Sequence, residues 1–115
     1  MRDNLVVNKS YEFALEVIRV YKFLVENRRE FVLSKQLLRS GTSIGANVEE
    51  AESAQSKRDF LAKMNIALKE AKETRYWLRL LKDSGYIDGS EIFERVEELC
   101  MILSSIVKTT SNSVK

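Results

Sequence analysis

Apolar residues between Phe60 and Leu81 recur in alternating steps of four and three, over about six helical turns. The members of this series are Phe60, Met64, Ala67, Ala71, Thr74, Leu78 and Leu81. Such spacing keeps one seam of a helix in contact with partner helices in a left-handed bundle. The 115 residues include no proline and only four glycines, so very little in the chain interrupts long helices. Together these features predict an all-α fold.

Three further segments carry helical spacing, and the sequence predicts helices over approximately residues 9–27, 31–54, 57–83 and 91–109. In the first helix, the expected core-facing residues are Tyr11, Leu15, Ile18, Tyr21 or Lys22, and Val25. In the second they are Leu37, Gly41, Ile44, Val48 and Ala51, and in the fourth Ile92, Val96, Leu99, Leu103 and Ile106. Long helices that are joined by short turns pack as antiparallel neighbours. We therefore expect a single domain, an antiparallel up-down-up-down four-helix bundle.

Several helix ends have recognisable signals. At the start of the third helix, Ser56 and Asp59 form a capping-box pattern in which each can accept a backbone hydrogen bond. Gly85 can adopt the left-handed conformation that ends this helix. The tail from Thr109 to Lys115 is rich in Ser, Thr and Asn and is expected to fray. Other candidate N-caps are Ser10 or Asn8 for the first helix and Ser90 for the fourth.

Two glycines, Gly41 and Gly45, lie inside the predicted second helix. A phosphate-binding P-loop has four residues between its glycines and then a lysine, whereas here three residues intervene and Ala46 follows. A dinucleotide-binding fingerprint needs a preceding strand, and none is predicted. Each glycine costs a helix about 1 kcal/mol relative to alanine, which favours the close approach of another helix as the explanation. A ligand contact at Asn47 or Glu50 is the alternative.

A specific motif surrounds these glycines and continues along the chain as SIGAN, KRDF, ALKE and GYI. Its positions are Arg39, Ser40, Thr42, Ser43, Ile44, Ala46, Asn47, Glu50, Lys57, Asp59, Phe60, Ala67, Leu68, Glu70 and Gly85–Ile87. In these residues the chain resembles the 23S rRNA intervening-sequence proteins, a four-helix-bundle family also described as ribosomal protein-like. The resemblance spans nearly the whole chain. Ala51 departs from the family pattern, which usually has glycine there, and implies a less flexible helix exit.

The resemblance also carries expectations about assembly and partners. The family is similar to the accessory variability determinant proteins of diversity-generating retroelements. Those proteins are pentameric barrels of four-helix bundles whose basic surfaces engage nucleic acid and a reverse transcriptase. The resemblance therefore implies a homopentamer and points to RNA or DNA as a partner, and it supplies no catalytic residue.

The net charge is only +2, but the basic and acidic residues are unevenly distributed along the chain. Lys57–Lys82 holds eight basic and three acidic residues, whereas Glu91–Val107 holds four acidic residues and one basic residue. A helical wheel places most of the basic residues of the third helix on one flank and its acidic residues on the other. Such a flank can be solvated and internally paired, can bind phosphates, or can face the acidic fourth helix of a neighbouring subunit. The candidate nucleic-acid-binding residues are Arg58, Lys69, Lys72, Arg75, Arg79 and Lys82.

Apolar residues outside the seam, Trp77 among them, lie on the acidic flank of the predicted third helix. Exposed apolar patches that contain tryptophan mark contact sites. Small residues on the outer face of the second helix would let another surface come close there as well. The candidate oligomer-interface residues are Ile66, Trp77, Leu80, Ala46 and Asn47. The alternative is that the twist of the bundle tucks Trp77 under the first or fourth helix.

The composition argues against catalysis. The chain has no histidine, which removes Ser-His and Cys-His nucleophile pairs and the Glu-x-x-His motif of di-iron bundles. Cys100 is expected to be a small buried apolar residue. Glutamates could coordinate a hard cation, but we expect them to be solvated, and we predict no metal, cofactor or small-molecule substrate. Those glutamates are Glu49, Glu50, Glu52, Glu97 and Glu98.

The chain has no apolar run of about 20 residues and no signal-peptide core at its N-terminus, so we expect a cytoplasmic protein without a membrane segment. The function favoured by the sequence and the resemblance is a non-catalytic homo-oligomeric module that binds RNA or DNA through the basic flank. A protein-interaction scaffold without nucleic-acid binding is the main alternative, and a metal-dependent enzyme is the third.

Overall fold

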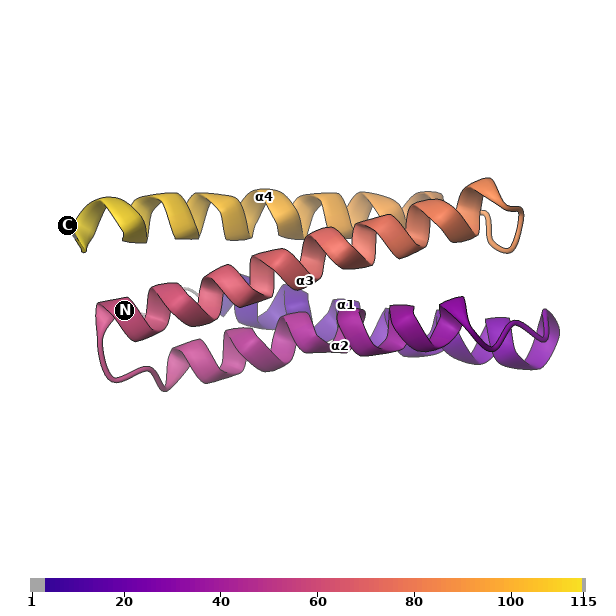
Figure 1. Cartoon of the computed structure of the whole chain (residues 1–115), viewed down its shortest axis with the longest axis horizontal. Helices are drawn as coiled ribbons and strands as arrows, with labels where there is room; N and C mark the ends of the chain where they lie inside the picture. The colour runs from indigo at the N-terminus through magenta and orange to yellow at the C-terminus, as the bar shows by residue number, and fades with distance from the viewer. Residues whose placement is uncertain (1–3, 115) are drawn as a thin grey trace.

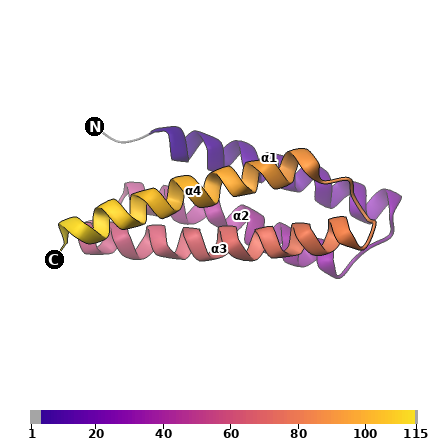
Figure 2. The ribbon, with the colours of Figure 1, turned by 90° about the horizontal axis from the view of Figure 1, so that it is seen from above.

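A computed structural model describes residues 4–114 of the chain, which form four helices (Figure 1). These are α1 (Asn4–Asn27), α2 (Leu33–Glu52), α3 (Lys57–Asp83) and α4 (Ser90–Ser113). Each helix packs against the next along the chain, and α1 also contacts α4, which closes the bundle. Consecutive helices run in opposite directions along a body of 47 × 21 × 20 Å (Figures 1 and 2). The predicted all-α, up-down-up-down four-helix bundle is confirmed.

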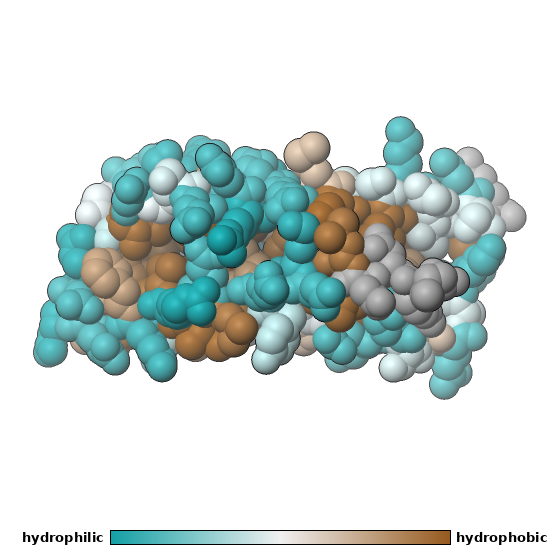
Figure 3. Space-filling view, turned by 180° about the vertical axis from the view of Figure 1, so that it is seen from behind, coloured by the Kyte–Doolittle hydropathy of each residue, from teal (hydrophilic) through white to brown (hydrophobic). Residues whose placement is uncertain are grey.

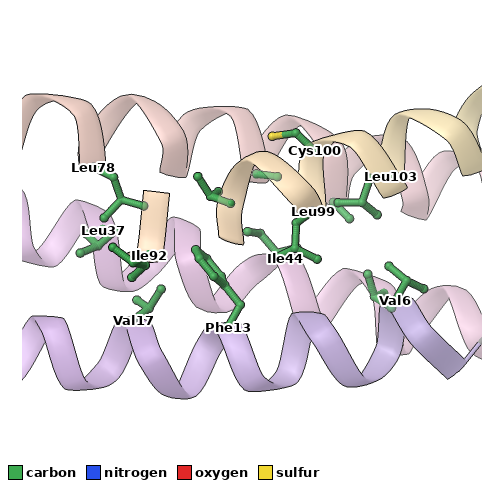
Figure 4. Close-up of a cluster of buried hydrophobic side chains, with 14 of the residues drawn as sticks. Val6, Phe13, Val17, Leu37, Ile44, Leu78, Ile92, Leu99, Cys100 and Leu103 are labelled. Atoms are coloured by element: carbon green, nitrogen blue, oxygen red, sulfur yellow. The ribbon is translucent and has the colours of Figure 1, made fainter. Parts of the chain in front are cut away.

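The core lies along the bundle axis, and side chains from all four helices point into it (Figure 4). The seam predicted in α3 is buried from Met64 to Leu81, with Phe60 half-buried at its start. The predicted face of α2 is buried in full, and that of α4 is buried except for the half-buried Ile106. Spacing in steps of four and three therefore identified the core of three helices correctly.

The prediction for α1 was wrong. Its buried face consists of Val6, Ser10, Phe13, Val17 and Leu24. The stripe expected in the core faces outward instead, with Tyr11 60%, Leu15 40% and Ile18 36% exposed. Both sets recur at helical spacing, because this helix is apolar on two faces. Periodicity alone could not tell which of the two faces the core.

The ends of the helices differ from the sequence prediction at several points. Because α1 already begins at Asn4, Asn8 and Ser10 lie within the helix and do not cap it. The N-cap of α4 is Gly89, at φ 74°, and Ser90 is the first helical residue. The tail expected to fray from residue 109 continues α4 to Ser113.

The ends of α3 match their predicted signals. The Asp59 amide donates to the Ser56 hydroxyl at 3.0 Å, and the Asp59 carboxylate accepts from the Gln55 amide at 3.3 Å. At the other end Gly85 has φ 86°, which only glycine adopts without strain. The Gly85 amide donates to the Lys82 carbonyl and the next amide, of Tyr86, to the Leu81 carbonyl, which makes a Schellman motif.

A single arginine joins the two loops at this end of the bundle. Arg28, just after α1, donates through Nη1 to the carbonyl oxygens of Gly85 and Tyr86, at 3.0 and 2.8 Å. Its guanidinium also lies 5.0 Å from the centre of the Tyr86 ring. The GYI segment of the motif thus positions the α3–α4 loop against the end of α1.

Close approach of α1 explains the glycine at position 41. A Cβ atom at Gly41 would lie 2.7 Å from Cγ2 of Val17, closer than side chains in proteins come to one another. At Gly45 the nearest atom to such a Cβ is the Ser10 carbonyl oxygen, at 3.4 Å, which is close to ordinary contact. The expectation that another helix approaches these glycines is confirmed, and Gly41 is the tighter of the two positions.

We expect Gly41→Ala to destabilise the protein and Gly45→Ala to be neutral or stabilising. Alanine gains about 1 kcal/mol of helix propensity at either position, but overpacking against the stiff Val17 costs about 1–3 kcal/mol. Urea unfolding of the two variants measures the difference. Adding Val17→Ala should recover part of the loss caused by Gly41→Ala, and equal stabilities of the two glycine variants would contradict the packing argument.

Glu30 holds the start of α2. Its carboxylate accepts from the amides of Val32, Leu33 and Ser34, at 3.2, 2.9 and 2.7 Å, and its own carbonyl oxygen accepts from the Ser34 hydroxyl. Partial burial alone would raise the pKa of Glu30, but these hydrogen bonds outweigh it and hold the pKa below its usual value. The side chain therefore satisfies amides that α2 would otherwise leave unpaired.

Replacing this cap gives a pH-dependent prediction. Because the folded-state pKa of Glu30 is lowered, its contribution is complete above the pKa of an unfolded glutamate and is lost as pH falls through the folded-state value. Glu30→Ala should lower the free energy of unfolding by about 1 kcal/mol near pH 7. Thermal unfolding measured across pH should show this deficit shrinking in acid. The matched exposed variant Glu26→Ala should show no deficit at pH 7, and a Glu30→Ala deficit that does not change with pH would contradict the cap.

Candidate nucleic-acid interface

α3 packs against α2 along one side and against α4 along the other, and the surface between the two sides faces outward. Its contacts with α2 include a buried hydrogen bond of 2.9 Å between the Thr74 and Ser40 hydroxyl groups. Its contacts with α4 include the ion pair between Arg75 and Glu97, at 3.4 Å. The surface between these contact lines carries both the predicted basic flank, nearer α4, and the predicted apolar set, nearer α2.

The acidic residues of α3 are compensated within the bundle. Arg39 of α2 pairs with Glu70 at 3.5 Å and with Glu73, whose carboxylate also accepts from the Trp77 indole N–H at 2.9 Å. The third acid, Asp59, caps its own helix. The acidic charge of α3 is therefore directed toward α2 and toward the start of the helix, away from the basic flank.

The predicted basic residues are not equivalent. Arg58, Lys69, Lys72, Arg79 and Lys82 are exposed, whereas Arg75 is half-buried and paired with Glu97. The Lys82 ammonium lies 5.8 Å from the centre of the Phe93 ring, so part of its charge is directed at α4. Within the described residues, no salt bridge involves Lys69, Lys72 or Arg79. Internal pairing thus accounts for Arg75 and leaves the rest of the flank uncompensated.

A groove of about 360 Å³ lies along this flank, between α3 and α4. Its lining residues are Lys72, Arg75, Tyr76, Arg79, Phe93 and Glu97. The sequence prediction named the cations but missed Tyr76, which is 51% exposed and lies one turn from both Lys72 and Arg79. In the sequence, Tyr76 stands four residues after Lys72 and three before Arg79. This spacing was the signal that could have placed it on the basic flank.

The five residues predicted for an oligomer interface lie on the outer side of α2 and α3. Ile66 is 41% exposed and Ala46 is exposed, whereas Trp77 and Leu80 are half-buried. Asn47 is half-buried, and its amide donates to the Ser43 carbonyl at 2.9 Å. The ion pair of Lys63 with Glu50 shows the register of the two antiparallel helices, in which Asn47 lies level with Ile66.

Trp77 is not tucked under α1 or α4, which was the alternative expected from the sequence. It packs partly against the core on the α2 side of α3, and its N–H is satisfied by Glu73. Its ring also meets that of Tyr76 edge-to-face, with centroids 5.1 Å apart. The indole is thus fixed in place with part of its surface uncovered.

The outward stripe of α1, formed by Tyr11, Leu15 and Ile18, is a second exposed apolar surface. In the view from behind, where α1 lies nearest the viewer, brown hydrophobic surface appears between teal side chains (Figure 3). α1 and α3 occupy diagonal positions in the bundle, since α1 packs on α2 and α4. The stripe therefore lies on the opposite side of the molecule from the outer surface of α3.

Among residues 4–114 no three His, Cys, Asp or Glu side chains gather in a way that could hold a metal ion. Of the glutamates considered as ligands, Glu50, Glu97 and Glu98 pair with Lys63, Arg75 and Lys9, respectively. Cys100 is buried, and this burial raises the pKa of its thiol and disfavours the reactive thiolate. None of the four helices is long and apolar enough to cross a membrane.

Comparison with known proteins establishes the family. The model of the 23S rRNA-intervening sequence protein family matches residues 2–109, and the chain belongs to this family. It is also similar to a crystal structure of a protein of unknown function from the S23 ribosomal protein family of Bacteroides thetaiotaomicron. The two are 54% identical with a TM-score of 0.89, over 90% of this chain and 99% of the other. A search of curated proteins finds no match.

Proposed function

We propose that this protein is a non-catalytic homo-oligomeric module that binds RNA or DNA through the basic flank of α3. The observation that carries the proposal is the uncompensated charge of Lys69, Lys72 and Arg79, whose acidic neighbours on α3 are engaged elsewhere. Lysine and arginine side chains on one exposed helix face match the phosphate backbone of a nucleic acid. The buried, reduced Cys100 fits the cytoplasm as its compartment.

The two apolar surfaces support homo-oligomerisation. The α1 stripe and the outer face of α2 and α3 differ in composition and lie on opposite sides of the bundle. Two different surfaces that bind each other make a head-to-tail contact, and such contacts close into rings when the rotation between subunits permits. We propose a pentameric ring on the sequence resemblance to the accessory variability determinant proteins alone.

A protein-interaction scaffold without nucleic-acid binding is the second candidate. It is favoured by the same apolar surfaces, because either could hold a different protein. Charge reversal distinguishes the two functions, because reversing the charges of the basic flank would abolish nucleic-acid binding and leave an apolar protein contact intact.

Lys72→Glu/Arg79→Glu should abolish binding of a labelled RNA at 50 mM salt. For about four phosphate contacts, the wild-type protein should show a slope of about −3 to −4 in log affinity against log salt concentration. Fluorescence anisotropy measures both quantities. The matched variant Arg19→Glu/Lys35→Glu changes the net charge equally at exposed positions on α1 and α2, away from the flank, and should keep most of the affinity. Binding that is absent or insensitive to salt in the wild-type protein would exclude this function.

Light scattering should give the wild-type protein about five times the mass of one chain. Ile18→Asp and Ile66→Asp each remove one of the two surfaces, so each variant alone should be monomeric, because burying an unpaired charge is costly. An equimolar mixture retains one intact pair of surfaces and should form a dimer. Met101→Asp, on the exposed face of α4, should remain assembled. A monomeric wild-type protein would contradict the assembly, and an assembled Ile18→Asp variant would exclude the α1 stripe from it.

A further inference from the structure

The groove between α3 and α4 combines features that a surface for duplex phosphates does not need. Cations and aromatic rings line it, and it also contains an arginine–glutamate ion pair. Its volume of about 360 Å³ is at the lower end of the range of small-molecule pockets. We propose that this groove binds single-stranded nucleic acid, with Tyr76 as the platform on which a base stacks. The proposal rests on the proposed function and adds the strand type and the contact residue.

The position of Tyr76 suits stacking. It is 51% exposed, and the edge-to-face contact with Trp77 braces its ring from the α2 side. Lys72 precedes it by one helical turn and Arg79 follows it by one turn, so the two cations are about 10 Å apart along the axis. A base on the ring would have a cation on each side for its flanking phosphates. Sites that bind single-stranded nucleic acid usually combine aromatic and cationic side chains.

The interior of the groove determines which side of the strand faces inward. Arg75 is neutralised by Glu97 at 3.4 Å, and the remaining carboxylate surface can only accept hydrogen bonds. A phosphate beside this neutral ion pair would meet no net positive charge, whereas beside Lys72 and Arg79 it would meet uncompensated cations. Phe93 adds a second aromatic surface to the lining. The bases therefore face the groove and the sugar–phosphate backbone faces outward, an arrangement that paired bases in a duplex cannot adopt.

The test compares one short RNA, free of self-complementarity, with the duplex that it forms with its complement, at equal salt. The wild-type protein should bind the single strand more tightly. Tyr76→Leu should weaken single-strand binding about 5- to 150-fold, the loss expected for one stacked base, and leave duplex binding unchanged. Tyr76→Phe keeps the ring and should keep the affinity. The control Phe31→Leu removes another exposed aromatic that has a cationic neighbour, Arg29, and should have no effect.

Trp77 supplies a second readout. It is the only tryptophan in the chain, and its ring contacts that of Tyr76. A base stacked on Tyr76 should change the indole fluorescence of the wild-type protein and of Tyr76→Phe. In Tyr76→Leu the change should be lost even at RNA concentrations that saturate the protein.

The outcomes separate the two proposals. Equal or tighter binding of the duplex, or an unchanged affinity of Tyr76→Leu for the single strand, would overturn the stacking site. If Lys72→Glu/Arg79→Glu still abolished binding in that case, the proposed function would stand. Absence of binding to either nucleic acid by the wild-type protein would overturn both.

Discussion

The tight contact between α1 and α2 at Gly41 determines which surfaces this protein presents. Val17 occupies the space that a side chain at position 41 would need, so α1 comes this close to α2 at Val17 because residue 41 is glycine. That approach directs Val6, Phe13, Val17 and Leu24 inward. The other apolar face of the same helix is then left outside. A packing requirement of the core thus creates the exposed stripe from which the proposed assembly starts.

Most of the fold could be predicted from the sequence, because in three of the four helices the most regular apolar spacing coincides with the buried face. For α3, the seam, the Ser56 cap and the Gly85 terminus are all encoded within a few residues of where they act. The same use of periodicity failed for α1, because Tyr11, Leu15 and Ile18 recur as regularly as the residues that are buried. The choice between its faces depends on a long-range contact with Gly41, which periodicity does not report.

The candidate site was predictable in part for the same kind of reason. The separation of charge on α3 follows from helical geometry, so the basic flank was visible in the sequence. The engagement of Arg75 by Glu97, and of Glu70 and Glu73 by Arg39, depends on partners from other helices. Tyr76 lines a groove only because α4 forms the opposite wall, and the sequence of α3 does not show this.

Arg28 has a consequence for how the bundle opens. By binding the carbonyl oxygens of Gly85 and Tyr86, it fastens the α1–α2 hairpin to the α3–α4 hairpin at the end that carries their two loops. The opposite end holds the α2–α3 connection, the start of α1 and the end of α4 (Figure 1). Because one guanidinium binds both carbonyl groups, the two hairpins can separate at this end only when the α3–α4 loop and the end of α1 move apart together as a unit.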